Sequence, residues 1–173
     1  LQGGGSVTEA ANAYRQLLDQ KLVTEAEPMR DGQATLDMPP SLLLRSLALK
    51  NLALIESERG AHQRALDMLL SAVQIQRADA VLWHRLGVLA RKTEQAHLAR
   101  YAFEQAARCS PHLQLGQRSL AQLLHSEGDL PSLQQLSTSS KRVLPPAPLP
   151  PALAAPERAR ARLASSGADT AGQ

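Results

Sequence analysis

Residues 80–111 read AVLWHRLGVLARKTEQAHLARYAFEQAARCSP, and this stretch decides the fold. Counted from Ala80, positions 4, 7, 8, 20, 24, 27 and 32 carry the residues of a tetratricopeptide signature, namely Trp83, Leu86, Gly87, Ala99, Phe103, Ala106 and Pro111. Two helices that cross closely need small residues at the crossing and bulky apolar residues beside it. The stretch therefore predicts a pair of antiparallel helices, which ends at Pro111 because proline lacks a backbone N–H.

The pattern recurs one repeat length upstream, which predicts units over 46–79 and 80–113. Gly60 falls at the turn between the two helices of the earlier unit. The equivalent core positions there are Leu49, Leu52, Ala53, Ala65, Leu69 and Ala72.

Downstream, a third unit over 114–136 begins well with Leu120 and Leu124, but Leu133 and Ser137 break the pattern. We expect this unit to be partial and to lack its second helix. Its apolar face would then be uncovered, so we expect a marginally stable fragment, and a cooperative melt well above about 60 °C would contradict this expectation.

The flanking segments complete the predicted organisation. Residues 1–24 contain Ala10, Tyr14 and Leu17 at the spacing of a second repeat helix, so a partial first repeat is expected there. Residues 25–41 contain Gly32 and paired prolines and are predicted to be an inserted loop. Residues 137–173 are rich in proline and alanine and are predicted to be disordered. The expected fold class is all-α: a tetratricopeptide-repeat helical solenoid, 42–136, with a disordered C-terminal tail.

The first helix of each unit supplies the candidate binding surface. Positions 2, 5, 9 and 12 share one helical face and line the concave groove of such a solenoid. The candidate partner-binding residues are Lys50, Leu54, His84, Val88, Arg91, Arg118, Gln122 and His125, and the same positions include Leu47, Ser57, Val81 and Leu115. Residues 46–126 carry ten basic and six acidic side chains, so the groove suits an amphipathic or acidic peptide. Alternatively, its cations are simply solvated surface charges.

Several other functions find little support in the sequence. Repeats that grip the carboxylate tails of chaperones need asparagines where this chain has Leu54 and Arg85. The basic residues lack the interleaved aromatics that stack nucleic-acid bases, so no direct nucleic-acid binding is expected. Cys109-x-x-His112 offers only two possible metal ligands, and Cys109 is more simply a half-buried hydrophobe. We expect no metal, no cofactor, no membrane contact and no enzymatic activity, because no catalytic or phosphate-binding motif is visible.

The tail contains one binding motif. Residues 142–148, RVLPPAP, fit the Arg-x-Leu-Pro-Pro-x-Pro form that Src-homology-3 domains recognise as a polyproline II helix. Its candidate contact residues are Arg142, Leu144, Pro145 and Pro148. One hypothesis is therefore a cytoplasmic signalling adaptor that uses the repeats for one partner and this motif for another. A chance match within a proline-rich segment is the alternative.

The repeats also resemble a particular family. The runs KNLALIESERGAHQRAL at 50–66 and LWHRLGVLARKTEQAHLARYAFEQAARCSPH at 82–112 resemble the N-terminal repeats of calcineurin-binding protein cabin. Ala13-Tyr14 and Leu17-Leu18 resemble that family's first repeat helix, so the likeness extends over about residues 7–136. After Leu136 the chain departs from the family pattern.

This resemblance implies a nuclear scaffold. Members of the family are large subunits of the HIR histone chaperone complex, which assembles nucleosomes independently of DNA replication, alongside HIRA and ubinuclein. The implied partners are HIRA and ubinuclein, with histones bound indirectly. The family binds calcineurin through its far C-terminal region. Neither a Pro-x-Ile-x-Ile-Thr nor a Leu-x-Val-Pro docking sequence occurs in this chain, so calcineurin binding is not expected of it.

Overall fold

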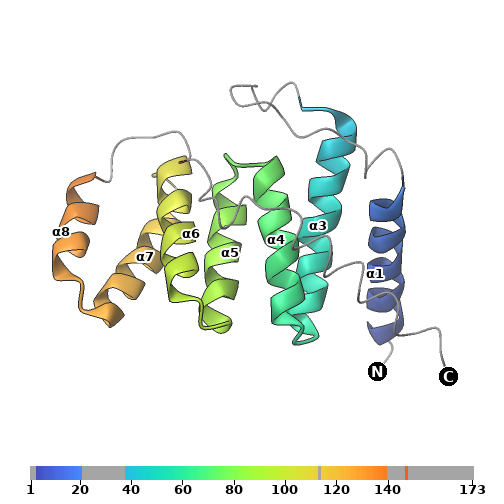
Figure 1. The fold of residues 1–173 in the computed structure, drawn as a ribbon, viewed down its shortest axis with the longest axis horizontal. Coiled ribbons are helices and arrows are strands. Elements are labelled where there is room, and N and C mark those ends of the chain that lie inside the picture. The colour runs from blue at the N-terminus through green and yellow to red at the C-terminus, as the bar shows by residue number, and fades with distance from the viewer. Residues whose placement is uncertain (1–2, 21–37, 113, 140–146, 148–173) are drawn as a thin grey trace.

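The structure is a computed structural model that describes residues 3–20, 38–112, 114–139 and Ala147. All regular structure in these residues is helical, which confirms the predicted all-α class. The helices are α1 (Gly3–Asp19), α3 (Pro40–Glu58), α4 (His62–Ile75), α5 (Ala80–Lys92), α6 (Ala96–Cys109), α7 (Gln114–Glu127) and α8 (Leu130–Ser139). Figure 1 shows them side by side in a row from α1 to α8, the arrangement of a helical repeat solenoid.

Three helical hairpins form this row, and their turns share one backbone feature. The hairpins are α3–α4, α5–α6 and α7–α8. Each turn has one residue with positive φ: Gly60 at 80°, Glu94 at 59° and Gly128 at 72°. These residues follow one another at intervals of one repeat length, so the turn geometry repeats together with the sequence pattern. Glycine adopts a positive φ without strain, whereas a residue with a side chain is strained in this conformation. Glu94 is the one of these three turn residues that is not glycine.

The signature residues of the second hairpin fill its core as predicted. Trp83 and Phe103 are fully buried, and the rings of Trp83 and Tyr101 pack nearly perpendicular to each other with centroids 5.9 Å apart. The Trp83 indole N–H donates to the backbone carbonyl of Arg77 at 2.6 Å, so its polar atom is satisfied. Gly87 lies where the two helices meet: a β-carbon there would fall 2.6 Å from the Phe103 ring. The close approach of the Phe103 ring explains why the signature combines a bulky residue at position 24 with a glycine at position 8.

The third unit has both of its helices, so the expectation that it lacks the second one is wrong. Leu133 and Leu136 of α8 pack against the buried core and partly cover α7. Local signals explain the helix: Gly128 makes the turn, and Asp129 Oδ1 accepts the backbone N–H of Ser132 at 3.2 Å as a helix cap. In addition, the Arg100 guanidinium on α6 lies 2.9 Å from Asp129. The helix runs to Ser139, three residues into the predicted tail.

The helix α3 starts earlier than the sequence suggested. It begins at Pro40, within the segment predicted as a loop, and Pro39 is its N-cap residue. Proline is accommodated in the first turn because the N–H it lacks would have no partner within the helix. Residues 21–37, which include most of the predicted loop, and the predicted tail apart from residues 137–139 and Ala147 lie outside the described residues.

At the other end of the row, α1 packs against α3, as expected for the second helix of a preceding unit. Ala11 is fully buried in this contact, and the Asn51 amide donates to the Tyr14 hydroxyl at 3.0 Å. Arg15 lies 2.6 Å from the Glu56 carboxylate, whose side chain is only 4% exposed. Two further guanidinium groups, of Arg59 and Arg64, lie 3.8 and 3.9 Å from Glu56. Three arginines thus compensate one buried acid between α1, α3 and α4.

Candidate protein-binding groove

The first helices of the three hairpins carry a set of exposed apolar residues. Besides Leu43 and Leu44 in the first turn of α3, five recur at matching positions: Leu47 (52% exposed), Leu54 (41%), Val81 (39%), Val88 (39%) and Leu115 (47%). Each lies at position 2 or 9 of its unit, the positions from which the sequence predicts groove residues. We call these five residues, on α3, α5 and α7, the apolar stripe. Large hydrophobic side chains clustered on an exposed face are typical of a protein-interaction surface.

A pocket of about 270 Å³ lies between α3 and α5. Leu54 and Val88 of the apolar stripe line it, together with the guanidinium-bearing Arg85 and with Lys92. The other lining residues are Ala53, Ser57, Leu69, His84 and Leu89. No acidic residue is among them, so the pocket combines apolar walls with positive charge. A smaller hollow on the other side of α5 is lined by Val81, His84 and Leu115 and reaches α7.

His84 links these two hollows but is partly committed to the fold. Its Nε2 lies 3.0 Å from the Ser119 hydroxyl on α7, and its ring centroid lies 5.7 Å from that of Phe103. Burial lowers the pKa of His84 below its usual value, and the positive charge of Arg85 lowers it further. The imidazole is therefore neutral near pH 7. A partner at this surface would therefore meet a polar but uncharged imidazole ring at His84, not a positive charge.

Lys50 holds two units together. Its ammonium lies 2.7 Å from the Asp79 carboxylate, and both side chains are about three-quarters buried, with 23% and 25% exposed. Asp79 is the N-cap of α5 and accepts the Leu82 backbone N–H at 3.0 Å. Burial raises the pKa of Asp79, but the hydrogen bonds from Lys50 and Leu82 and the charge of Lys50 outweigh it, so the net pKa lies below the usual value. The charge of Lys50 is therefore compensated within the fold.

The remaining predicted groove residues lie outside the pocket. Arg91, Gln122 and His125 are exposed, as is Arg118, whose guanidinium donates to Gln114 at 2.7 Å. In contrast, Arg85 and Lys92 line the pocket, although neither occupies a position from which groove residues are predicted. They occupy positions 6 and 13 of their unit, which turn toward the preceding first helix. Lys92 follows Val88 by four residues and Arg85 by seven, so all three lie on the same face of one helix. This spacing could have identified Lys92 from the sequence.

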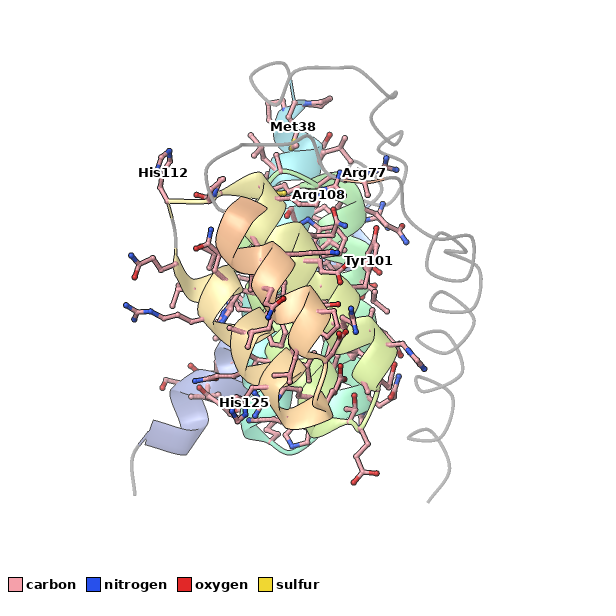
Figure 2. The ribbon with its side chains drawn as sticks, turned by 90° about the vertical axis from the view of Figure 1, so that its left-hand side faces the viewer. Met38, Arg77, Tyr101, Arg108, His112 and His125 are labelled. Atoms are coloured by element: carbon pink, nitrogen blue, oxygen red, sulfur yellow. The ribbon has the colours of Figure 1, made fainter. Side chains whose placement is uncertain are left out.

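The structure gives no support for a metal centre or a membrane span in the part of the chain that it describes. No group of three or more histidine, cysteine, aspartate or glutamate side chains is placed there to hold an ion. None of the described helices is both long and apolar enough to cross a bilayer. His112 is exposed and points away from the helices in Figure 2. The half-buried Cys109 thiol lies 3.5 Å from the Arg77 carbonyl, and burial raises its pKa to about 11.

The proline-rich motif is represented in the structure by a single residue. Arg142, Leu144, Pro145 and Pro148 lie outside the described residues. Ala147, between two prolines of the motif, is described, and its backbone N–H donates to the Gln105 side-chain oxygen of α6 at 2.8 Å. Gln105 is only 1% exposed. This contact involves a second helix of a hairpin, whereas the apolar stripe lies on first helices.

Stacked helical hairpins with exposed apolar residues on their first helices define a helical repeat protein, a class whose extended surfaces bind other proteins. Its family is given by comparison with known sequences. The chain belongs to the CABIN1 N-terminal domain family, whose model matches residues 2–145. It is similar to Calcineurin-binding protein 1 of Arabidopsis thaliana, with 39% identity over 88 residues. The match covers 50% of this chain but 5% of that relative, so the chain corresponds to a small part of the longer protein.

Proposed function

We propose that this chain is a non-enzymatic scaffold segment of a nuclear, HIR-type histone chaperone complex. In this proposal the repeats bind other subunits, HIRA and ubinuclein, while histones are bound indirectly. One observation carries it: an exposed apolar stripe runs over three first helices of a solenoid that belongs to the CABIN1 N-terminal domain family. A monomer gains nothing from exposing five large hydrophobic side chains at regularly repeated positions, whereas a scaffold needs such a surface.

The mechanism is the holding together of partners. Stacked hairpins form a rigid, extended surface, and subunits bound along it are kept at high effective concentration relative to one another. The chain itself needs no chemistry for this role. Calcineurin binding, which the name of the Arabidopsis relative states for that protein, is not assigned to this segment because the chain lacks both docking sequences.

The proposal is tested by affinity capture from nuclear extract with the full chain as bait, read by mass spectrometry. The test variant carries Val88→Glu and Leu115→Glu, both on the apolar stripe. The matched control is Leu130→Glu, which places the same charge on α8 at a residue that is 60% exposed and outside the stripe. We expect the wild type and the control to recover HIRA or ubinuclein and the test variant to lose them.

Two results would contradict the proposal. Capture of neither subunit by the wild-type chain would remove the histone chaperone assignment. Equal capture by the stripe variant and the wild type would show that the contact lies on another face. Deletion of 141–151 addresses the adaptor hypothesis separately, because only that hypothesis requires the proline-rich motif.

A further inference from the structure

The pocket between α3 and α5 has the properties of a specific recognition site within the broader stripe. Its volume of about 270 Å³ lies just below the range of about 300–1,000 Å³ that is usual for small-molecule sites. It is open at a face that already exposes Leu54 and Val88. A space of this size and position suits one or two apolar side chains of a bound polypeptide better than a cofactor.

The charge at the pocket indicates what surrounds those apolar side chains. Arg85 and Lys92, one on each side of Val88 along α5, line the pocket and form no ion pair with another residue in the described ranges. Neither acid of α3 lines the pocket: Glu58 is exposed, and the buried Glu56 is paired with arginines outside the pocket. A guanidinium group binds a carboxylate through two parallel hydrogen bonds, so Arg85 provides both charge and geometry for an acidic side chain.

We propose that this pocket binds an acidic amphipathic segment of a partner protein, with an apolar side chain between Leu54 and Val88 and carboxylates on Arg85 and Lys92. The inference rests on the proposed scaffold function, since it specifies which kind of segment that surface takes. Apolar contact supplies most of the affinity, because exposed Leu54 and Val88 become buried. The two cations supply selectivity for acidic over basic segments.

The test uses the purified full chain and a defined probe, the fluorescein-labelled peptide EELLEELFEEL, in a fluorescence polarisation titration. Its leucines and phenylalanine recur at helical spacing and leave glutamates on the other face. The lysine counterpart KKLLKKLFKKL has the same apolar pattern with reversed charge. We expect saturable binding of the acidic peptide, no saturable binding of the basic one, and weaker binding of the acidic peptide as salt is raised.

Two variants and two matched controls locate the binding. Arg85→Glu with Lys92→Glu is expected to weaken the acidic peptide at least about tenfold and to create binding of the basic peptide. Val88→Glu, within the pocket, is expected to weaken the acidic peptide to a similar degree. His97→Glu adds an acidic charge at an exposed residue of α6 outside the pocket, and Leu130→Glu changes an exposed leucine on α8. Both controls are expected to bind the acidic peptide within about twofold of the wild type. Circular dichroism melts check that all variants fold.

The result separates this inference from the proposed function. Absence of saturable binding by the acidic peptide, or equal binding of both peptides, would overturn the pocket assignment even if HIRA and ubinuclein are captured from extract. Peptide binding that depends on Arg85, Lys92 and Val88 would support the pocket even if neither subunit is captured. Equal effects of His97→Glu and of the Arg85→Glu, Lys92→Glu double variant would also overturn it, because general surface charge would then explain the binding.

Discussion

The ring of Phe103 on α6 lies directly over Gly87 on α5, so that a β-carbon added to Gly87 would fall 2.6 Å from two ring carbons. Phe103 is fully buried and also contacts His84, so its ring has little freedom to move. We expect Gly87→Ala to lower the free energy of unfolding by about 1–3 kcal/mol, as is usual when a packed core is overfilled.

Chemical denaturation of the purified chain measures this effect. Gly5→Ala is the matched control, because no atom lies within 4 Å of the position its β-carbon would take on α1. That substitution is expected to leave stability unchanged or to raise it by up to about 1 kcal/mol, since alanine is the better helix former. Equal stability of the Gly87 variant and the wild type would contradict the close crossing of α5 and α6.

The repeated turn position permits a test of backbone conformation alone. Gly60 and Glu94 both have positive φ, and nothing lies within 4 Å of a β-carbon built on Gly60. We expect Gly60→Ala to cost about 1–2 kcal/mol, the usual penalty of a left-handed conformation for a residue with a side chain. Conversely, Glu94→Gly is expected to raise stability by up to about 1 kcal/mol by removing that penalty. The two opposite shifts in the denaturation midpoint check the prediction, and a loss of stability in both variants would contradict it.

The Asp79 carboxylate predicts a dependence of stability on pH. Its pKa is lowered in the folded state, so it contributes stability above its ordinary pKa and loses that contribution as the pH falls through the folded value. We expect Asp79→Asn to cost about 1–2 kcal/mol near pH 7, because the asparagine amide can still cap α5 but the ammonium of Lys50 loses its carboxylate partner. The difference from the wild type should shrink as the pH is lowered below about 4.

Denaturation curves between neutral and acid pH measure this convergence. Asp67→Asn on α4 is the control, because the Asp67 carboxylate takes part in a single long contact, 3.4 Å from the Gln63 amide. A difference between the wild type and Asp79→Asn that is constant at every pH would be inconsistent with a lowered pKa.

The buried Glu56 carboxylate predicts a local effect on α1. Because Arg15 reaches it from α1, Glu56→Gln is expected to weaken the docking of that helix and to cost about 1–3 kcal/mol. Hydrogen exchange should become faster in α1 while α5 and α6 keep their protection. Glu58→Gln, an exposed site on the same helix, is the control. Unchanged exchange in α1 would mean that the Arg15–Glu56 contact is not needed to hold α1 against α3.

The sequence alone was enough to predict the structural features that depend on the repeated pattern. Trp83, Gly87 and Phe103 predicted the hairpin, and the repeat length placed the turn at Gly60 correctly, because the same small and large residues are needed wherever two helices cross. The helix α8 was missed because Leu133 and Ser137 do not match the pattern. Its stability comes instead from the Asp129 cap and from Arg100, which is distant in sequence.

The candidate site was predicted less completely. Position rules identified Leu54 and Val88, but they also selected Lys50, whose charge is taken up by Asp79. Whether a cation is free or paired depends on contacts between units, which single-helix periodicity does not describe. For the same reason Arg85 and Lys92 were overlooked, since they become groove residues only once α3 is packed beside α5.

The hydrogen bond between Ala147 and Gln105 bears on how many proteins the chain can engage at one time. Gln105 belongs to α6, whereas the apolar stripe belongs to α3, α5 and α7. A ligand seated on the stripe therefore does not compete for the Gln105 amide, and release of Ala147 removes no side chain from the stripe. A partner bound to the stripe and a partner that displaced Ala147 from Gln105 would therefore contact different helices, so neither would have to leave before the other could bind.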